Sequence, residues 1–266
     1  MSTAVITGAS SGIGYEFAKI LAEKQYQLVL IARNLDRLNE IKQELETRHD
    51  TSIILIPADL ALDNIAEGII KEIRYRNLKV EILINNAGFG YCGPYPQQPW
   101  QNERDMLHVN VQSLAQLTRL ILPLMFERKK GYICNVASTA AFYPGPLMAV
   151  YYATKAYVVS YSQALRNELK DSGVAVSVLC PGPTATNFQT IAGVDQTRLF
   201  KMSRLATARE VAEYGFRAML RNQAVAIPGL SNKLLYFTSR FLLRDMVTAM
   251  VRWIQSVKTG SRKKHG

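Results

Sequence analysis

Cysteine and histidine are scarce in this sequence, which has three of each in 266 residues. The six residues are Cys92, Cys134, Cys180, His49, His108 and His265. An odd number of widely spaced cysteines, with no Cys-x-x-Cys pair, excludes a disulfide scaffold and leaves no ligand set at zinc spacing. We therefore expect no metal site. Glycine and proline, 16 and 10 residues, are too few for a fibrous or low-complexity chain.

Long apolar runs without interruption are also missing. The longest uncharged segments, 132–154 and 172–194, both contain proline and glycine near their middles. They indicate strand–loop–helix segments and not membrane spans. An apolar run starts by residue 3, with no basic region and no small-residue cleavage site, so we expect no secretory signal. The expected location is cytoplasmic, or peripheral at a membrane surface facing the cytoplasm.

The positive charge is concentrated at one end of the chain. The net charge is +11, and residues 231–266 carry eight Lys or Arg and one Asp, a net of +7. The first 230 residues hold the remaining +4, which is an ordinary surface charge. A nucleic-acid-binding protein is expected to carry a basic stripe with aromatic residues on its folded body. We therefore expect no nucleic-acid partner.

Apolar runs alternate with helical patterns along the chain. Strands are predicted at 3–7, 28–32, 52–57, 81–85, 132–137, 175–180 and 224–227. Helices are predicted at 12–24, 35–48, 64–75, 101–128, 149–171 and 207–220. The strand runs are apolar almost throughout, as in strands that helices cover on both faces. The pattern predicts one doubly wound α/β domain of Rossmann type at 1–230, with about seven parallel strands, and a C-terminal extension at 231–266.

A glycine-rich turn joins the first predicted strand to the first predicted helix. Gly8 suits the tight turn, Gly12 lets the backbone approach a pyrophosphate, and Gly14 lets the helix pack on the strand. The N–H groups and dipole at the helix start favour phosphate charge. Ser10, Ser11 and Ile13, which fill the turn, are candidate ligands as well.

Two other interpretations of this turn stay open. Its GxxxGxG spacing departs from GxGxxG, so it could be a turn without a ligand. The segment 8–12 also matches G-x-S-x-G, with Ser10 as the nucleophile of a hydrolase. A hydrolase needs an acid and then a histidine downstream, where only His108 and His265 are found.

Several further motifs follow the glycine turn in a fixed order. They are Asp59-Leu60, Asn85-Asn86-Ala87-Gly88, Asn110, Ser138, Tyr151-x-x-x-Lys155 and Pro181-Gly182 with Thr184. With TGASSGIG at 7–14, the sequence resembles the short-chain dehydrogenase/reductase family over residues 3–230. The resemblance implies hydride transfer between a nicotinamide cofactor and a carbonyl or alcohol. It is stronger for members that reduce fatty-acyl, steroid or other lipophilic carbonyls.

Tyr151 and Lys155 are four residues apart, so they share one face of the helix predicted at 149–171. A nearby ammonium stabilises a tyrosinate, so we expect the Tyr151 pKa below its usual value of about 10. Tyr151 could then exchange the alcohol proton as the hydride moves. Ser138 ends the strand predicted at 132–137 and could hydrogen-bond the substrate oxygen. The alternative is a surface tyrosine beside a solvated lysine.

The resemblance implies further roles for single residues. Lys155 would also bond the nicotinamide ribose, and Asn110 would hold a local bend of the helix 101–128 and a water leading to Lys155. Asp59 would bond the adenine, with Leu60 alongside. Asn110 could instead make only a packing bond, and Asn86 to Gly88 could be only a structural turn. The full set of expected cofactor contacts is Gly8, Ser10, Ser11, Gly12, Ile13, Gly14, Arg33, Asp59, Leu60, Asn86, Ala87, Gly88, Tyr151, Lys155, Pro181, Gly182 and Thr184.

The end of the second predicted strand indicates which nicotinamide is used. Folds that bind NAD place Asp or Glu there, to bond the ribose 2′-hydroxyl. Here Arg33 stands at that end, and its fork of N–H donors suits a 2′-phosphate. We therefore expect NADP(H), and NAD(H) less. Ser11 departs from the many NADP-using members that carry a second basic residue just before the middle glycine.

The resemblance implies that the segment after Thr184 is a mobile lid over the substrate. Its apolar residues would then favour a lipophilic carbonyl. They are Phe188, Ile191, Val194, Leu199, Phe200 and Met202, with Asn187 among them. Tyr91, Tyr143 and Pro144 are further candidates for the pocket. The residues could also simply pack on the core. The expected function is NADP(H)-dependent oxidoreduction of a lipophilic carbonyl or alcohol by a homo-oligomer, with Tyr151 as the acid/base. The alternative is a cofactor-binding regulatory protein without turnover.

The C-terminal segment has helical spacing from 234 to 257. Its apolar positions are Leu243, Val247, Met250, Ile254 and Val257, with Trp253 beside them. Arg240, Arg244 and Arg252 form a second stripe, and four more basic residues follow before the end. Such a helix can lie on an anionic membrane surface, through 234–264. It can also pack on its own domain or on a second subunit, and both interpretations stay open.

Overall fold

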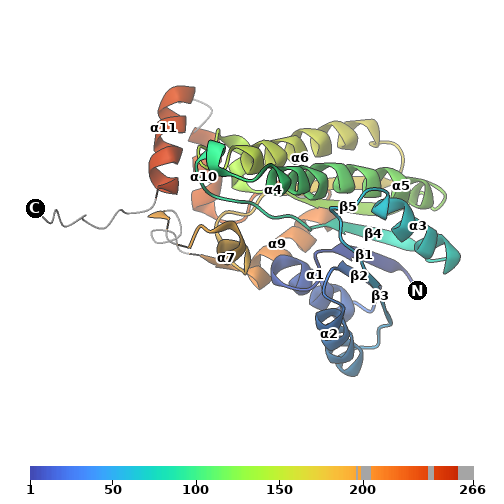
Figure 1. Cartoon of the computed structure of the whole chain (residues 1–266). Helices are drawn as coiled ribbons and strands as arrows, with labels where there is room; N and C mark the ends of the chain where they lie inside the picture. The colour runs from blue at the N-terminus through green and yellow to red at the C-terminus, as the bar shows by residue number, and fades with distance from the viewer. Residues whose placement is uncertain (196, 199–204, 239–242, 257–266) are drawn as a thin grey trace, which may run out of the picture.

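The computed structural model describes residues 1–195, 197–198, 205–238 and 243–256. It confirms the predicted parallel sheet, whose strand order is β3-β2-β1-β4-β5-β6-β9 (Figure 1). The strands are β1 (Thr3–Thr7), β2 (Gln27–Ala32), β3 (Ile53–Pro57), β4 (Val80–Asn85), β5 (Gly131–Val136), β6 (Val174–Leu179) and β9 (Val225–Ala226). Every neighbouring pair in this sheet is parallel.

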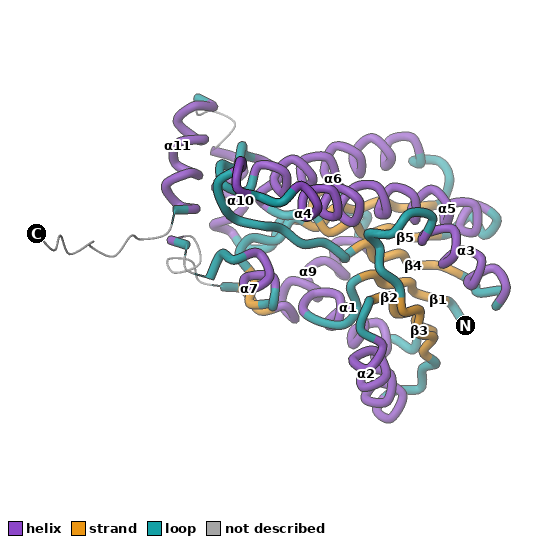
Figure 2. Tube along the Cα trace, viewed as in Figure 1, coloured by secondary structure: helices purple, strands orange, loops and turns teal. Residues whose placement is uncertain are grey.

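Helices cover both faces of the sheet (Figure 2). One layer is α1 (Gly12–Glu23), α2 (Leu35–Arg48) and α9 (Ala208–Leu220), and the other is α3 (Ile65–Tyr75), α5 (Leu114–Phe126) and α6 (Ala149–Glu168). Within β1, Ala4 and Ile6 pack toward the first layer and Val5 toward the second. All three are fully buried, which explains why the strand has no polar alternation.

The long helix predicted at 101–128 is interrupted. It consists of α4 (Trp100–Leu107), a π-helical turn η2 (His108–Ser113) and α5. Within η2, His108 Nδ1 lies 3.0 Å from the Leu60 carbonyl, and Ser113 Oγ donates to the same oxygen at 2.7 Å. The wider turn therefore ties the helix to the loop after β3. π-Helical turns of this kind are common at functional sites.

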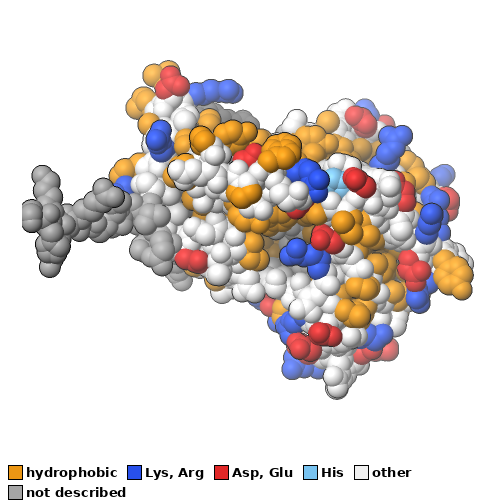
Figure 3. Space-filling view, viewed as in Figure 1, with side chains coloured by type: hydrophobic (Ala, Val, Ile, Leu, Met, Phe, Trp, Pro, Cys, Tyr) orange, Lys and Arg blue, Asp and Glu red, His pale blue; other side chains and the backbone are white. Residues whose placement is uncertain are grey.

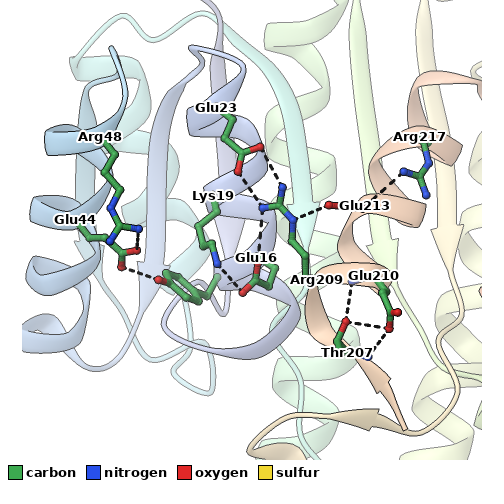
Figure 4. A network of polar contacts seen from close by, with 11 residues as sticks. Glu16, Lys19, Glu23, Glu44, Arg48, Thr207, Arg209, Glu210, Glu213 and Arg217 are labelled. Atoms are coloured by element: carbon green, nitrogen blue, oxygen red, sulfur yellow. Dashed lines mark hydrogen bonds and ion pairs between the residues drawn. The ribbon is translucent and has the colours of Figure 1, made fainter. Parts of the chain in front are cut away.

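A polar network links helix α1, which follows the glycine turn, to α9 (Figure 4). Arg209 on α9 bonds both carboxylate oxygens of Glu23 on α1, at 3.0 and 3.1 Å, and Glu213 at 2.7 Å. These carboxylates raise the pKa of Arg209 above its usual range. Thr207 begins α9 with a capping box that pairs it with Glu210.

The chain after β6 differs most from the predicted pattern. A small parallel pair, β7 (Thr184–Ala185) with β8 (Ala206–Thr207), was not predicted, and α7 (Phe188–Ala192) lies between them in sequence. The segment predicted as one helix at 234–257 contains two, α10 (Leu230–Thr238) and α11 (Arg244–Gln255). Leu243, just before α11, has extended backbone. In Figure 1, α7, α10 and α11 gather at the end of the molecule opposite the N-terminus.

Helix α11 packs on its own domain. Val247 and Val251 are buried in a cluster with Met148, Tyr152 and Val194. The described part of the extension therefore belongs to the same fold as residues 1–230. No helix in the described ranges has the length and apolar character to cross a bilayer.

Candidate active site

A cavity of about 650 Å³ lies at the carboxyl ends of the central strands. Strand β1 has β2 on one side and β4 on the other, so the order in which the chain adds strands to the sheet reverses there. Open α/β sheets bind their ligands in the crevice at this point. The volume is within the range of about 300–1,000 Å³ that small-molecule and cofactor sites have. The cavity is therefore the candidate site.

The glycine turn forms one half of the cavity, called here the glycine-turn half. Gly8 and Gly12 have positive φ values of 64° and 56°, which glycine adopts without strain. A Cβ at Gly8 would lie 2.8 Å from Asn86 Nδ2, and a Cβ at Gly14 would overlap the Gly8 carbonyl oxygen. Ser11 begins α1 without a side-chain cap, so backbone N–H groups at the helix start are left for a ligand. This cradle fits a dinucleotide pyrophosphate.

Asn86 holds the turn against the end of β4. Its Nδ2 donates to the carbonyl oxygens of Thr7 at 3.1 Å and Gly8 at 3.2 Å. The backbone N–H groups of Asn86 and Ala87 both donate to Thr7 Oγ1 at 3.0 Å. Asn86, Ala87 and Gly88 also line the cavity. The structure thus gives this motif a structural role at a position where it can contact a cofactor.

Arg33, Asp59 and Leu60 line the far end of the glycine-turn half. Arg33 is exposed at the end of β2, and Asp59 Oδ1 accepts from the backbone N–H of Ala61 at 3.0 Å. A second guanidinium, which the sequence reasoning missed, lies close by. Arg37 Nε donates to the Ser10 carbonyl oxygen at 3.4 Å. Its position four residues after Arg33, in the first turns of α2, was the available signal.

Ser138, Tyr151 and Lys155 meet on the wall of the cavity to which α6 contributes Tyr151 and Lys155. All three line it, and Tyr151 and Lys155 are 8% and 5% exposed. Tyr151 shares a side-chain hydrogen bond with Ser138. Lys155 Nζ donates to the Val136 carbonyl oxygen at 2.9 Å and lies 5.8 Å from the centre of the Tyr151 ring. The surface interpretation of Tyr151 and Lys155 is therefore wrong.

The expected direction of the Tyr151 pKa is also wrong. Burial raises the pKa of Tyr151 above its usual 10, and the hydrogen bond with Ser138 acts in the opposite direction. Burial likewise lowers the pKa of Lys155 from 10.5 to about 8. The sequence shows the spacing of the pair but not its desolvation, which disfavours both charged forms. Tyr151 is thus held as a protonated phenol, which can donate a proton.

Asn110 lies in the π-helical turn η2. Its Oδ1 accepts from the Phe89 N–H at 3.1 Å, and its Nδ2 donates to the Phe89 carbonyl at 3.0 Å and to Thr154 Oγ1 at 3.1 Å. A Cβ at Gly88 would lie 3.0 Å from Asn110 Oδ1 and 3.1 Å from Lys155 Nζ. The helix expected at 101–128 contains a π-helical turn at Asn110, and this residue positions the loop after β4 beside Lys155. The bend and the water expected there stay predictions.

The second half of the cavity, called here the apolar half, adjoins Tyr151. Met148, Phe188 and Val194 line it, and the Phe188 ring centre lies 5.3 Å from that of Tyr151. Of the other predicted lining residues, Tyr91, Tyr143, Asn187 and Ile191 line the cavity and Pro144 does not. Leu199, Phe200 and Met202 lie outside the described residues.

The C-terminal extension completes the cavity, which the sequence reasoning missed. Met250, Val251, Ile254 and Gln255 of α11 line its apolar half. Helix α10 contributes Leu235 and Asn232. A Cβ at Gly182 would lie 2.6 Å from the Asn232 side chain, which places α10 against the Pro181-Gly182 motif. Pro181, Gly182 and Thr184 all line the cavity, and their contact with a cofactor stays a prediction.

The arrangement leaves no support for a hydrolase. Among the described residues that line the cavity there is no histidine. His108 is bound instead to the Leu60 carbonyl and lies 3.1 Å from Asp63. His265 falls outside the described part of the chain. Ser10 therefore has no described general base.

A dinucleotide cradle beside a Ser–Tyr–Lys set defines an oxidoreductase-type α/β site. Residues 2–196 match the family model described as short chain dehydrogenase, and the chain belongs to this family. It is 34% identical over 194 residues to the very-long-chain 3-oxoacyl-CoA reductase of Mus musculus, covering 71% of this chain and 61% of that protein. It is 37% identical over 185 residues to the 17-beta-hydroxysteroid dehydrogenase type 3 of Homo sapiens, covering 69% and 59%.

A solved structure extends the likeness to the whole chain. The short-chain dehydrogenase from Sphingobium yanoikuyae in complex with NADPH has a TM-score of 0.81 and 28% sequence identity. The match covers 97% of this chain and 99% of that one. By contrast, the chain spans about three fifths of the length of the two reductase and dehydrogenase relatives.

Proposed function

We propose that the protein reduces the carbonyl group of a lipophilic substrate, using NADPH as the hydride donor. The observation that carries the proposal is the set of Ser138 with the buried Tyr151 and Lys155, which lies between a dinucleotide cradle and an apolar half-cavity. The alternative, a regulatory protein without turnover, would be expected to lose one member of that set. Relatives named as reductases of 3-oxoacyl-CoA and as a hydroxysteroid dehydrogenase support the substrate class.

Tyr151, Ser138 and Lys155 each have a separate role in the proposed reduction. A bound NADPH supplies the hydride that reaches the carbonyl carbon. Tyr151, kept protonated by burial, donates its phenol proton to the carbonyl oxygen as negative charge develops there. Ser138 donates a hydrogen bond to the same oxygen and stabilises that charge. Lys155 holds its ammonium below the tyrosine ring, where it favours the tyrosinate that the proton transfer leaves.

NADP(H) is the proposed cofactor because the end of β2 carries a cation and no acid. Arg33 lines the cavity there, and Arg37 reaches the glycine turn through Ser10. A guanidinium binds phosphate oxygens with two parallel hydrogen bonds. The similar Sphingobium protein was solved in complex with NADPH, which supports the same choice.

The test is an NADPH-consumption screen of the purified chain. The substrates are ketones and 3-oxoacyl thioesters of graded chain length, with a steroid ketone as a rigid counterpart. We expect kcat/KM to rise with the apolar surface of the substrate. Burial of a substrate group the size of an apolar side chain should stabilise the transition state by up to about 1.5–3 kcal/mol. Binding of NADPH without oxidation in the presence of any carbonyl would favour the regulatory alternative.

We also propose that the outer face of α11 contacts an anionic membrane surface. Leu243, Met246 and Trp253 are 73%, 60% and 52% exposed, and Arg244 and Arg252 are exposed beside them. Figure 3 shows hydrophobic and basic side chains next to each other where α11 lies. Because Val247 and Val251 face the domain, only this outer face is available. The cytoplasmic location and the homo-oligomer stay predictions.

Vesicle cosedimentation tests the membrane contact. The full chain is compared with the double variant Met246→Glu, Trp253→Glu, which leaves the buried face of α11 intact. We expect binding to anionic but not neutral vesicles at low salt, and loss of binding in the variant. If the full chain stays in solution with anionic vesicles, the contact is excluded. A change of sedimentation without vesicles would instead assign the face to a second copy of the chain.

A further inference from the structure

A buried amide from the C-terminal helix reaches the apolar half of the cavity. Gln255 is 2% exposed and lines the cavity beside Tyr152. Its Nε2 donates to the Tyr152 hydroxyl at 2.7 Å. Its Oε1 is buried and has no hydrogen-bond partner among the residues that the structure describes. A polar atom in that state needs an explanation, because buried amide oxygens are nearly always hydrogen-bonded.

Tyr152 is fixed so that its hydroxyl meets this amide. Its ring lies against Gly145, where a Cβ would overlap the ring carbons. The ring is edge-on to that of Tyr151, with centres 6.1 Å apart and planes at 76°. Gly145 therefore allows the ring position, and the neighbouring tyrosine restricts it. Of the two adjacent tyrosines, Tyr151 is placed for the reacting carbonyl in the proposed reduction and Tyr152 contacts Gln255.

The pair leaves hydrogen-bonding capacity for a third group. With Gln255 Nε2 on the Tyr152 hydroxyl, the hydroxyl hydrogen can be donated and Oε1 can accept. With the amide turned over, Tyr152 donates to Oε1 and the amide N–H groups are available. In both arrangements an uncharged donor or acceptor is offered inside the cavity. The apolar neighbours Val251 and Ile254 make an ionised group unfavourable there.

The cationic side chains that line the cavity do not contact Gln255 or Tyr152 in the described hydrogen bonds. Among the described residues that line the cavity, the Lys and Arg side chains are Arg33, at the end of β2, and Lys155, beneath Tyr151. A carboxylate at this position would therefore lack a described counter-charge, whereas a hydroxyl or carbonyl oxygen would not need one.

We propose that Tyr152 and Gln255 form a second polar anchor, which binds an uncharged hydroxyl or carbonyl oxygen of the substrate other than the oxygen held by Tyr151. The inference rests on the proposed reduction and specifies its substrates. They are lipophilic ketones with a second oxygen, and hydroxyketones, diketones and 3-oxoacyl thioesters all meet this description. A site built to hydrogen-bond a substrate oxygen discriminates strongly against the analogue that lacks it.

The test compares ketones of one carbon skeleton with and without a second oxygen. Methyl ketones are paired with hydroxyketones whose hydroxyl moves stepwise along the chain, and with the 3-oxoacyl thioester of the same length. The ratio of kcat/KM, two-oxygen over one-oxygen substrate, is measured in the unmutated chain and in Gln255→Met and Tyr152→Phe. Tyr152→Phe leaves α11 unaltered, so it serves if Gln255→Met does not fold. Ala249→Gln, on the exposed side of α11, is the matched control.

We expect a ratio of tenfold or more for at least one two-oxygen substrate. This ratio should fall toward one in both single variants and should be kept in Ala249→Gln. It should fall no further in the double variant, because the two side chains act through one contact. Reduction of one-oxygen ketones with no preference for any second oxygen would overturn the inference and leave the proposed function standing. A preference that both variants keep would also overturn it. If no ketone is reduced at all, the proposed function fails, and the inference with it.

Discussion

The glycine-turn half of the cavity is built from strand ends and backbone, whereas the apolar half is built from side chains of later segments. Gly8 and Asn86 directly follow the neighbouring strands β1 and β4, whose ends are fixed by the sheet, and Gly12 begins α1. Phe188 comes from α7, and Val251 and Gln255 come from α11, helices that lie later in the chain than the central strands of the sheet. The glycine-turn half can stay the same while the apolar half changes, which is how one fold can carry different activities.

The largest expected effect lies where the two halves meet. Tyr151→Phe removes the phenol proton, so we expect kcat for ketone reduction to fall by about 10²–10⁴-fold. NADPH binding should survive, because the change leaves the glycine-turn half untouched. Product analysis at fixed reaction times measures kcat, and a binding titration measures the affinity for NADPH. Tyr157→Phe, at an exposed position of the same helix, is the matched control. Full activity in Tyr151→Phe would remove the proposed acid.

A change in the glycine-turn half should act on cofactor choice alone. Arg33→Asp replaces a charge-assisted contact, worth about 1.5–3 kcal/mol, by repulsion. We expect NADPH binding to weaken by about one to two orders of magnitude and NADH binding to suffer less. Fluorescence titration with both nucleotides measures this. Equal or tighter NADH binding by the unmutated chain would show that the cation at the end of β2 does not select the cofactor.

The pH profile tests the electrostatics between the halves. Burial lowers the pKa of Lys155 to about 8, so its ammonium is present below that pH and lost above it. The pKa of Tyr151 is raised, so the phenol stays protonated through the same window. We therefore expect the rate of ketone reduction to fall above about pH 8, approaching tenfold per pH unit. Initial rates between pH 6 and 10 measure it, and a flat profile would contradict the assignment of Lys155.

The smallest effect concerns the packing of α9 against α1, the helix that follows the glycine turn. Arg209→Met breaks the contact of α9 with Glu23 on α1, and the contact with Glu213 within α9. Because these groups are partly exposed, we expect the free energy of unfolding to fall by only about 1 kcal/mol. Arg217→Met is the control, since Arg217 lies 3.8 Å from Glu213 and is more exposed. Denaturant unfolding of both variants measures the difference, and equal losses would leave the network without a specific role.

The glycine-turn half could be predicted because its signals are local in sequence. Gly8 to Gly14 form one turn, and Tyr151 and Lys155 are one helical turn apart. The direction of the Tyr151 pKa shift could not be predicted, because the burial of Tyr151 depends on Phe188 and other residues that pack against it only in the fold. Arg37 was overlooked although its spacing from Arg33 is regular.

The apolar half was predicted least well, for two physical reasons. The helix expected at 234–257 breaks before Arg244, but Leu243 continues the apolar period and so hides the break. Gln255 meets Tyr152 across 103 residues of sequence, and no periodicity records such a pairing. The amphipathic pattern of the helix that contains Gln255 shows that one face is apolar. It does not show whether that face packs on its own domain or on another surface.

The most direct test of the account is the fate of the hydride. The chain is incubated with NADPH deuterated at the transferable position of the nicotinamide and with a ketone found in the substrate screen. We predict one deuterium at the carbinol carbon of the product alcohol, and a loss of this product in Tyr151→Phe. An alcohol without deuterium, or NADPH that binds and is never oxidised with any carbonyl of the series, would contradict hydride transfer by this site.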